Sequence, residues 1–234
     1  LLFIIFGCDS KRDALGADNE IRVICSEMDR NNIELFLRSI FNDTLYTPEP
    51  EPYYFLKFSN PDTYSRLKNQ TNIVVAAIER DFTNSGLDLV KNILPEQQFK
   101  ATELNDPLIL AKDVHSKNQL FMVINSNSID NLMGFVDVKR NFIRKHFNDQ
   151  FKFRQGRFLF SENNYNVLRD SLKEQFGWSL KLPWGWEIIR KVPDSNFVWL
   201  GKEMPYQWIG VGWVNGNIVE DELSIGNHIW EWPK

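Results

Sequence analysis

The stretch Asn72-Ile73-Val74-Val75-Ala76-Ala77-Ile78-Glu79 is an almost unbroken apolar run. A strand with one face in water alternates apolar and polar residues, whereas a strand covered on both faces is apolar throughout. The run therefore predicts a central strand of a sheet that is packed on both sides.

Strand-like and helix-like segments alternate on either side of this run. Apolar residues recur at helical spacing over about 30–42, 85–94, 129–148 and 161–176. Ser26 and Asp29 are candidate caps for the first of these helices, and Gly177 occupies the left-handed cap position after the last. Strand-like runs lie at 21–25, 53–58, 108–114, 119–124 and 153–160, and then at 179–182, 186–192, 197–200 and 207–214.

This order of segments predicts an α+β fold. We expect mixed or antiparallel sheets with helices on at least one face, and a strand-rich, tryptophan-rich C-terminal part. A soft boundary near 125–128 divides the chain into an α/β subdomain, 20–126, and a helix followed by a strand-rich subdomain, 127–234.

Composition excludes several classes of protein. Of the 234 residues, 43% are hydrophobic, which excludes intrinsic disorder. A mean hydropathy of −0.36 argues against a polytopic membrane protein. The net charge of −4 argues against a general nucleic-acid binder, so we expect no nucleic-acid partner. Two cysteines cannot form a disulfide framework or a four-cysteine zinc site.

The N-terminal stretch predicts the compartment. Leu1-Leu2-Phe3-Ile4-Ile5-Phe6-Gly7-Cys8 is followed at once by polar residues, as at the end of a bacterial lipoprotein signal peptide. In this interpretation 1–7 is a signal peptide truncated at its N-terminus, Cys8 carries the lipid, and 8–19 is a flexible tether. The alternative is a buried edge strand with an incidental cysteine. A lipidated Cys8 would anchor the protein to a bacterial membrane in the cell envelope. Asp9, the residue after it, does not decide between the inner and the outer membrane.

All eight tryptophans lie in the last quarter of the chain. Trp184 and Trp186, like Trp230 and Trp232, are two residues apart, a spacing that places both rings of a pair on one face of a strand. With Glu187, Asp221 or Glu231 nearby, such rings could form a glycan-binding face, or the cleft of a polysaccharide hydrolase. The alternative is that a thin β-subdomain fills its core with aromatic side chains.

Two charged segments are candidate contact surfaces. The stretch 47–52 contains three prolines with Glu49 and Glu51 between them, and it favours a stiff extended segment that can bind a partner. The stretch 139–157 contains seven basic residues and one acid, and its candidate membrane contacts are Lys139, Arg140, Arg144 and Lys145. The interleaved phenylalanines would also fit single-stranded nucleic acid, and the plainest interpretation is a solvated helix face.

The sequence offers no catalytic motif, and we assign no catalytic residue, metal site or cofactor. Asp113 and His115 could begin a metal site, but a polar pair in a hairpin turn explains them better. Cys25 alternates with apolar residues in a strand-like stretch, which is typical of a buried structural thiol.

Several of these segments together resemble a family of Gram-negative envelope lipoproteins known only as a domain of unknown function. The matching pieces are the start ending at Cys8, the strand at 21–24, the element at 48–52 running into aromatic residues, Phe176-Gly177, Leu182-Pro183, and 196–200. The resemblance covers about 20–200 and implies a location and an outline, without catalytic residues. Because members of that family continue past the point where this chain ends, it also implies truncation at the C-terminus. We therefore expect a lipid-anchored, non-catalytic module that binds an envelope protein or glycan.

Overall fold

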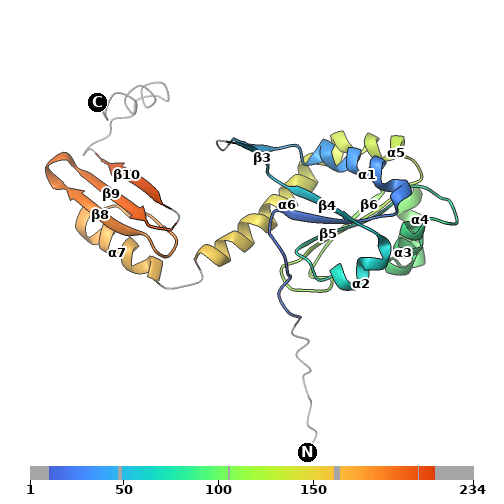
Figure 1. The fold of residues 1–234 in the computed structure, drawn as a ribbon, viewed down its shortest axis with the longest axis horizontal. Coiled ribbons are helices and arrows are strands. Elements are labelled where there is room, and N and C mark those ends of the chain that lie inside the picture. The colour runs from blue at the N-terminus through green and yellow to red at the C-terminus, as the bar shows by residue number, and fades with distance from the viewer. Residues whose placement is uncertain (1–10, 47–48, 105, 161–163, 205, 214–234) are drawn as a thin grey trace, which may run out of the picture. The chain divides into compact units, whose positions relative to one another are not determined.

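The computed structural model describes residues 11–46, 49–104, 106–160, 164–204 and 206–213 (Figure 1). The chain forms two compact units, 1–158 and 159–234, each of which is described by itself. Both units combine helices and strands, and the sheets are mixed or antiparallel, so the predicted α+β fold is confirmed.

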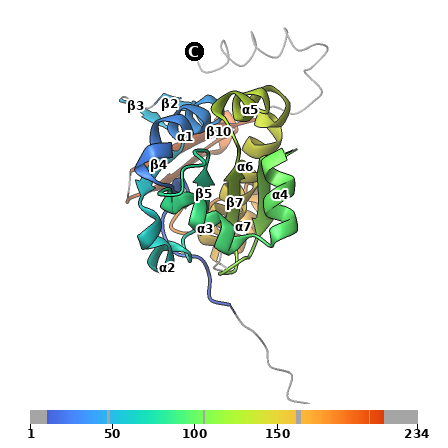
Figure 2. The ribbon, with the colours of Figure 1, turned by 90° about the vertical axis from the view of Figure 1, so that its right-hand side faces the viewer.

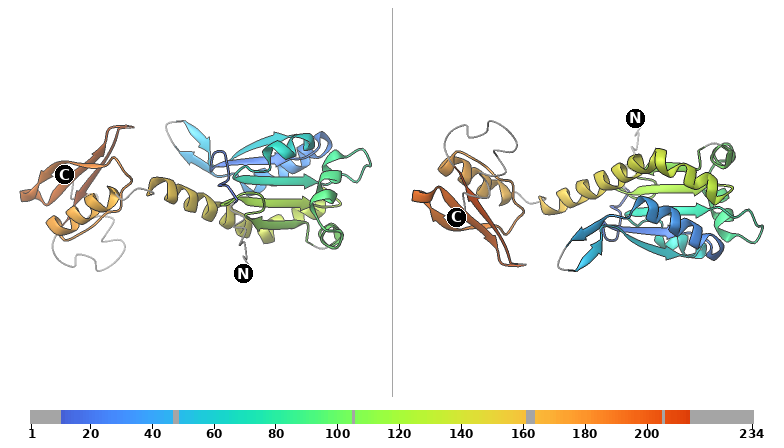
Figure 3. Two further views of the ribbon diagram at one scale, coloured as in Figure 1. Left: turned by 90° about the horizontal axis from the view of Figure 1, so that it is seen from below. Right: turned by 90° about the horizontal axis from the view of Figure 1, so that it is seen from above.

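The first unit contains a five-stranded sheet with the order β4-β1-β5-β7-β6 (Figure 3). Its strands are β1 (Glu20–Ile24), β4 (Phe55–Ser59), β5 (Asn72–Ala77), β6 (Leu108–Lys112) and β7 (Leu120–Asn125). The first four strands in this order are parallel, and β6 pairs antiparallel with β7 as an edge strand. The predicted central strand is β5, which is buried along its whole length.

Helices cover both faces of this sheet (Figure 2). They are α1 (Glu27–Ile40), α2 (Tyr64–Leu67), α3 (Ser85–Ile93), α4 (Glu96–Leu104), α5 (Ile129–Gly134) and α6 (Val136–Leu159), with a 3-10 turn η1 (Pro61–Thr63) before α2. Alternate residues of β5 point to opposite faces. Val74 therefore packs with α1, α5 and α6, and Val75 packs with α2, α3 and α4.

The proline-rich segment forms part of a small hairpin. Strand β2 (Thr44–Tyr46) pairs antiparallel with β3 (Pro50–Pro52), and residues 47–48 between them lie outside the described part of the chain. The extended backbone that the prolines predict is therefore present in β3, paired with a neighbouring strand.

The expected flexible tether is wrong for residues 11–19, because this segment is fixed against the first unit. The amide of Ala14 donates to Lys117 O at 2.9 Å, and the amide of Leu15 donates to Asn69 O at 2.9 Å. In return, Leu15 O accepts from the amide of Thr71 at 2.8 Å. Ala14 is only 5% exposed. Asp18 also forms an ion pair with Arg154 of α6 at 2.5 Å. The polar composition of this segment does not predict the docking, because many of its hydrogen bonds are formed by main-chain atoms, which every sequence supplies.

Helix α6 corrects two further expectations. The predicted strand at 153–160 is instead the end of this helix, which continues to Leu159 because no proline interrupts it. The predicted division near 125–128 also differs from the structure, in which the two compact units divide after Phe158. The reason is that Val136, Ile143 and Phe147 of α6 are buried in the core of the first unit.

In the described part of the second unit, helix α7 packs on an antiparallel sheet with the order β10-β9-β8. Its elements are α7 (Asn164–Phe176), β8 (Glu187–Val192), the 3-10 turn η2 (Pro193–Ser195), β9 (Phe197–Lys202) and β10 (Gln207–Gly212). Gly177 ends α7 with a φ of 76°, as its position predicts. The strand predicted at 179–182 is not formed. Its backbone is irregular, and Leu180 and Leu182 pack on the core of the second unit.

Candidate functional site

The connections of the first unit create a switch point at the carboxyl edge of its sheet. Strands β1 and β5 are parallel neighbours, yet α1 after β1 packs on one face and α3 after β5 packs on the other. In open α/β sheets, ligands bind outside the carboxyl ends of strands at such a point. The carboxyl ends of β1 and β5 are therefore the first place to look for a site.

Asp29, in the first turn of α1, joins the elements that meet there. Its side chain is completely buried, and Oδ1 accepts hydrogen bonds from the amides of Ile78 and Glu79 at 3.1 and 2.8 Å. Its Oδ2 accepts from Asn84 Nδ2 at 2.8 Å and from Ser26 Oγ at 3.1 Å. One carboxylate thus fixes the start of α1 to the end of β5 and to the start of α3.

Asn84 continues this network as the N-cap of α3. Its Oδ1 accepts from the amides of Gly86 and Leu87 at 2.9 and 3.2 Å. A Cβ on Gly86 would lie 3.0 Å from the amide nitrogen of Ser26 and 3.1 Å from Ala76 O. A side chain at position 86 would therefore push these backbone atoms away by a few tenths of an ångström, so glycine favours the close approach of α3 to the β1–α1 connection.

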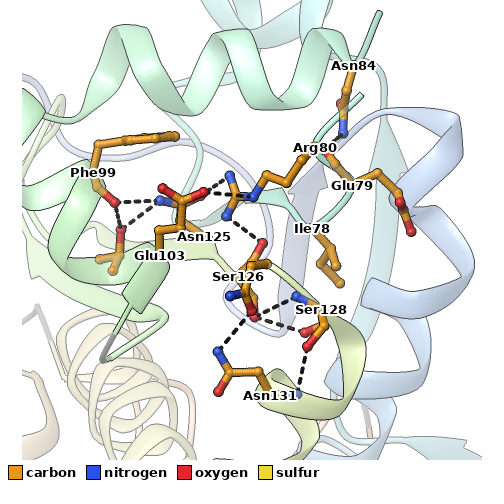
Figure 4. A network of polar contacts seen from close by, with 12 residues as sticks. Ile78, Glu79, Arg80, Asn84, Phe99, Glu103, Asn125, Ser126, Ser128 and Asn131 are labelled. Carbon is orange, nitrogen blue, oxygen red and sulfur yellow. Dashed lines mark hydrogen bonds and ion pairs between the residues drawn. The ribbon is translucent and has the colours of Figure 1, made fainter. Parts of the chain in front are cut away.

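Arg80 forms a second network, beside the carboxyl end of β7 (Figure 4). Its guanidinium donates to Asn125 Oδ1 at 2.9 Å and to Ser126 O at 2.5 Å, and it pairs with Glu103 at 3.3 Å. Burial lowers the pKa of Arg80, and the nearby carboxylate of Glu103 opposes this shift. Through these contacts Arg80 ties α4 to the sheet, although its Nε reaches Glu103 only as an ion pair and forms no hydrogen bond.

A hollow of about 350 Å³, lined mostly by residues with polar side chains, lies at this carboxyl edge. Its lining residues come from the start of α1, the turn η1 after β4 and the first turn of α3, and they are Ser26, Glu27, Asn60, Pro61, Asp62 and Ser85. Two carboxylates, an amide and two hydroxyls supply mainly hydrogen-bond acceptors. The hollow therefore suits a ligand that is rich in hydrogen-bond donors.

Cys25, at the end of β1, is the described thiol nearest to this region. It is 3% exposed, and burial raises its pKa to about 12, with a further increase from Asp29. A thiol with this pKa stays protonated at neutral pH and is a poor nucleophile. Cys25 is thus a buried structural residue, as its sequence pattern predicts.

The structure separates the first tryptophan pair. Trp184 lies in the turn before β8 and is 48% exposed, with Lys202 Nζ 4.9 Å from its ring centroid. Trp186 instead packs on the core of the second unit. The prediction that both rings share a strand face is therefore wrong, because β8 begins only at Glu187.

The remaining parts of the predicted glycan-binding face are only partly described. Glu187 is exposed, whereas Trp230, Trp232, Asp221 and Glu231 lie outside the described residues. The hydrolase hypothesis therefore stays a prediction. Sequence reasoning did not single out Trp199 and Trp208, which are exposed and in edge-to-face contact with ring centroids 6.4 Å apart.

The basic stretch is largely neutralised by neighbouring acids. Lys139 pairs with Asp106 at 3.0 Å, Lys145 pairs with Asp149 at 2.5 Å, and Arg144 pairs with Asp43. Arg140 is partly buried on the same helix. These pairs reduce the positive charge that α6 presents to an anionic surface.

Glu49 and Glu51 are both exposed near the small hairpin. Glu51 lines a hollow of about 490 Å³ between β3 and the end of α1. The structure therefore leaves this segment accessible to a partner and does not bring it to the carboxyl edge of the sheet.

The remaining candidates do not form a metal site. His115 Nε2 lies 2.8 Å from the hydroxyl of Tyr64, and Asp113 Oδ1 accepts from the amide of Gln119 at 3.3 Å. Among the described residues, no group of three or more His, Cys, Asp or Glu side chains could hold a metal ion. Cys8 lies outside the described part of the chain.

No protein-family model matches this chain, and no curated protein or solved structure is similar enough to count as a match. Within the described ranges, none of the helices is long and apolar enough to cross a membrane.

Proposed function

We propose that this chain is a lipid-anchored protein of the bacterial cell envelope that binds a ligand or partner at the carboxyl edge of its five-stranded sheet. The observation that carries the binding role is the hollow just beyond the carboxyl ends of β1, β4 and β5, which is lined mostly by residues with polar side chains. Cys8, after an apolar run that ends in glycine, supplies the proposed anchor.

The network behind the hollow supports a binding role. Ser26 and Ser85 lie at the starts of two helices whose positions are fixed by the buried Asp29 and Asn84. A site on fixed elements loses little conformational entropy when a ligand binds. We therefore propose that the hollow is pre-formed.

The lining residues indicate the ligand chemistry. Glu27 and Asp62 are exposed carboxylates, and Glu27 is partly balanced by Arg30 at 3.5 Å. Carboxylates accept hydrogen bonds from ammonium groups and from hydroxyls. An amine-bearing or polyhydroxylated ligand, such as an envelope glycan or a basic protein segment, fits this lining best.

The anchor can be tested by intact-mass measurement of the chain expressed behind a complete signal peptide in a lipoprotein-processing host. We expect a mass that corresponds to cleavage before Cys8 and acylation of that residue, and partition into the detergent phase. The Cys8→Ser variant should lose both properties. An unmodified wild-type mass would contradict the anchor.

The hollow can be tested with a photo-crosslinking amino acid in place of Asp62, in the protein displayed in intact cells. We expect an adduct of defined mass that is at least several-fold weaker when Ser85→Trp fills the hollow. Lys91→Trp, an exposed change at the other end of α3, is the matched control and should keep the adduct. A lack of any adduct, or equal adducts in both variants, would contradict binding at the hollow.

A further inference from the structure

We infer that the docked segment 11–19 turns the amino edge of the five-stranded sheet toward an anionic lipid surface, with Lys11, Arg12, Lys68 and Lys117 as contacts to lipid headgroups. This inference rests on the proposed anchor at Cys8. It adds an orientation and a second binding surface, which the anchor alone does not imply.

The first step is the place where the segment docks. The amide of Lys117 donates to Arg12 O at 2.9 Å, and Leu15 bridges to the turn before β5. Residue 117 belongs to the turn that precedes β7, and both β5 and β7 are parallel strands. The segment therefore lies across the amino edge of the sheet.

The second step is the distance to the anchor. Three peptide steps separate Cys8 from Lys11, and an extended chain spans at most about 11 Å over that length. Because Lys11 Nζ donates to Asp113 O at 2.8 Å and to Val114 O at 3.0 Å, its position beside the hairpin is fixed. A lipid on Cys8 would thus hold the amino edge close to the bilayer.

The third step is the charge of this edge. Arg12 and Lys117 are exposed, and Lys11 and Lys68 are partly buried beside His115. Two acids lie nearby: Asp13, which is partly compensated by Arg157 at 3.5 Å, and Asp113, whose carboxylate keeps its charge while it accepts a hydrogen bond from the amide of Gln119. Cations therefore outnumber acids at this edge, and basic groups near a membrane attract anionic headgroups.

The fourth step is the position of the hollow. Parallel strands of five or six residues separate the amino edge from the carboxyl edge by about 20 Å. With the amino edge on the bilayer, Asp62 and Ser85 face away from it. The orientation thus leaves the proposed binding site open to the surrounding compartment.

The test supplies the anchor chemically, so that it does not depend on processing by a host. The full chain is coupled through Cys8 to a maleimide lipid in phosphatidylcholine vesicles, with or without phosphatidylglycerol. Cys25 does not compete, because it is buried and its thiol stays protonated. Lysine acetylation rates are then measured by peptide mass spectrometry.

On vesicles that contain phosphatidylglycerol, we expect Lys68 and Lys117 to be acetylated about fivefold more slowly than in solution. Lys57 on β4 and Lys100 on α4, which are both exposed, should keep their rates. High salt or pure phosphatidylcholine should remove the protection. The proposed contact would be overturned if all four lysines were slowed by the same factor, or if none were slowed. Equal protection of Lys68 and Lys117 on neutral lipid would overturn it too.

A pair of charge-matched variants makes the test more specific. Arg12→Gln with Lys117→Gln should abolish the protection of Lys68, whereas Lys57→Gln with Lys100→Gln should not. If the second pair had the same effect as the first, the contact would be a general charge effect and the inference would be wrong. A missing lipid in the host experiment would remove the proposed anchor, while the coupled vesicles still decide the orientation.

Discussion

Alanine in place of Asp29 is expected to lower the free energy of unfolding of the first unit by about 3–5 kcal/mol. The carboxylate is completely buried and accepts four hydrogen bonds. Without it, the amides of Ile78 and Glu79 and the side chain of Asn84 lose a buried partner. The cost of those unsatisfied donors exceeds the cost of the lost side-chain volume.

The tryptophans provide an internal reference for this measurement. All eight lie in the second unit, so tryptophan fluorescence in urea follows that unit, while far-UV circular dichroism follows both. We expect Asp29→Ala to lower the urea midpoint of the dichroism change that belongs to the first unit, and to leave the fluorescence midpoint where it is. A fluorescence midpoint that shifts by the same amount would contradict the assignment of the effect to the first unit.

Two variants serve as controls for Asp29→Ala. Asp29→Asn keeps one acceptor oxygen and is expected to cost roughly half as much. Asp62→Ala removes an exposed carboxylate and should change the unfolding free energy by less than about 0.5 kcal/mol. If Asp62→Ala were as destabilising as Asp29→Ala, the buried hydrogen bonds would not be the cause.

The second large effect is expected for Phe147→Ala in α6, with a loss of about 3–5 kcal/mol. Phe147 is 1% exposed and packs edge-to-face with Phe41, with ring centroids 4.9 Å apart. The cavity left by the ring cannot close, because α1 and the sheet hold its walls in place. The measurement again compares circular dichroism with tryptophan fluorescence in urea.

Phe142→Ala on the same helix is the matched control. Phe142 is 51% exposed, so we expect its truncation to cost less than about 1 kcal/mol. The predicted result for Phe147 also tests the division of the chain, because a boundary near 125–128 would place α6 in the second unit. In that case the fluorescence transition would shift instead.

Hydrophobic patterns predicted the sheet of the first unit well. The apolar run that forms β5 and the hairpin of β6 and β7 both follow from side-chain periodicity, which reports burial directly. The division of the chain could not be predicted in this way. Polar and basic residues at 152–157 interrupt the apolar pattern of α6, although a helix with an exposed end continues through such residues without difficulty.

The candidate site was much harder to predict. The sequence presents Asp29 as a helix cap, and its carboxylate instead points to residues about fifty positions away. Hydrogen bonds over such separations leave no local signal, so a single sequence does not indicate which acid is buried. The same holds for Asp18, whose polar surroundings indicated a tether and whose partner is Arg154.

The docked segment has a practical consequence for anyone who expresses this chain in pieces. A fragment trimmed to begin at the first strand would remove the partners of the Thr71 and Lys117 main-chain amides and uncover the surface against which Ala14 is buried. Poor yield from such a fragment would then reflect the loss of these contacts. It would not show that the complete first unit is unstable. The segment 11–19 is better regarded as part of the folded first unit than as a linker.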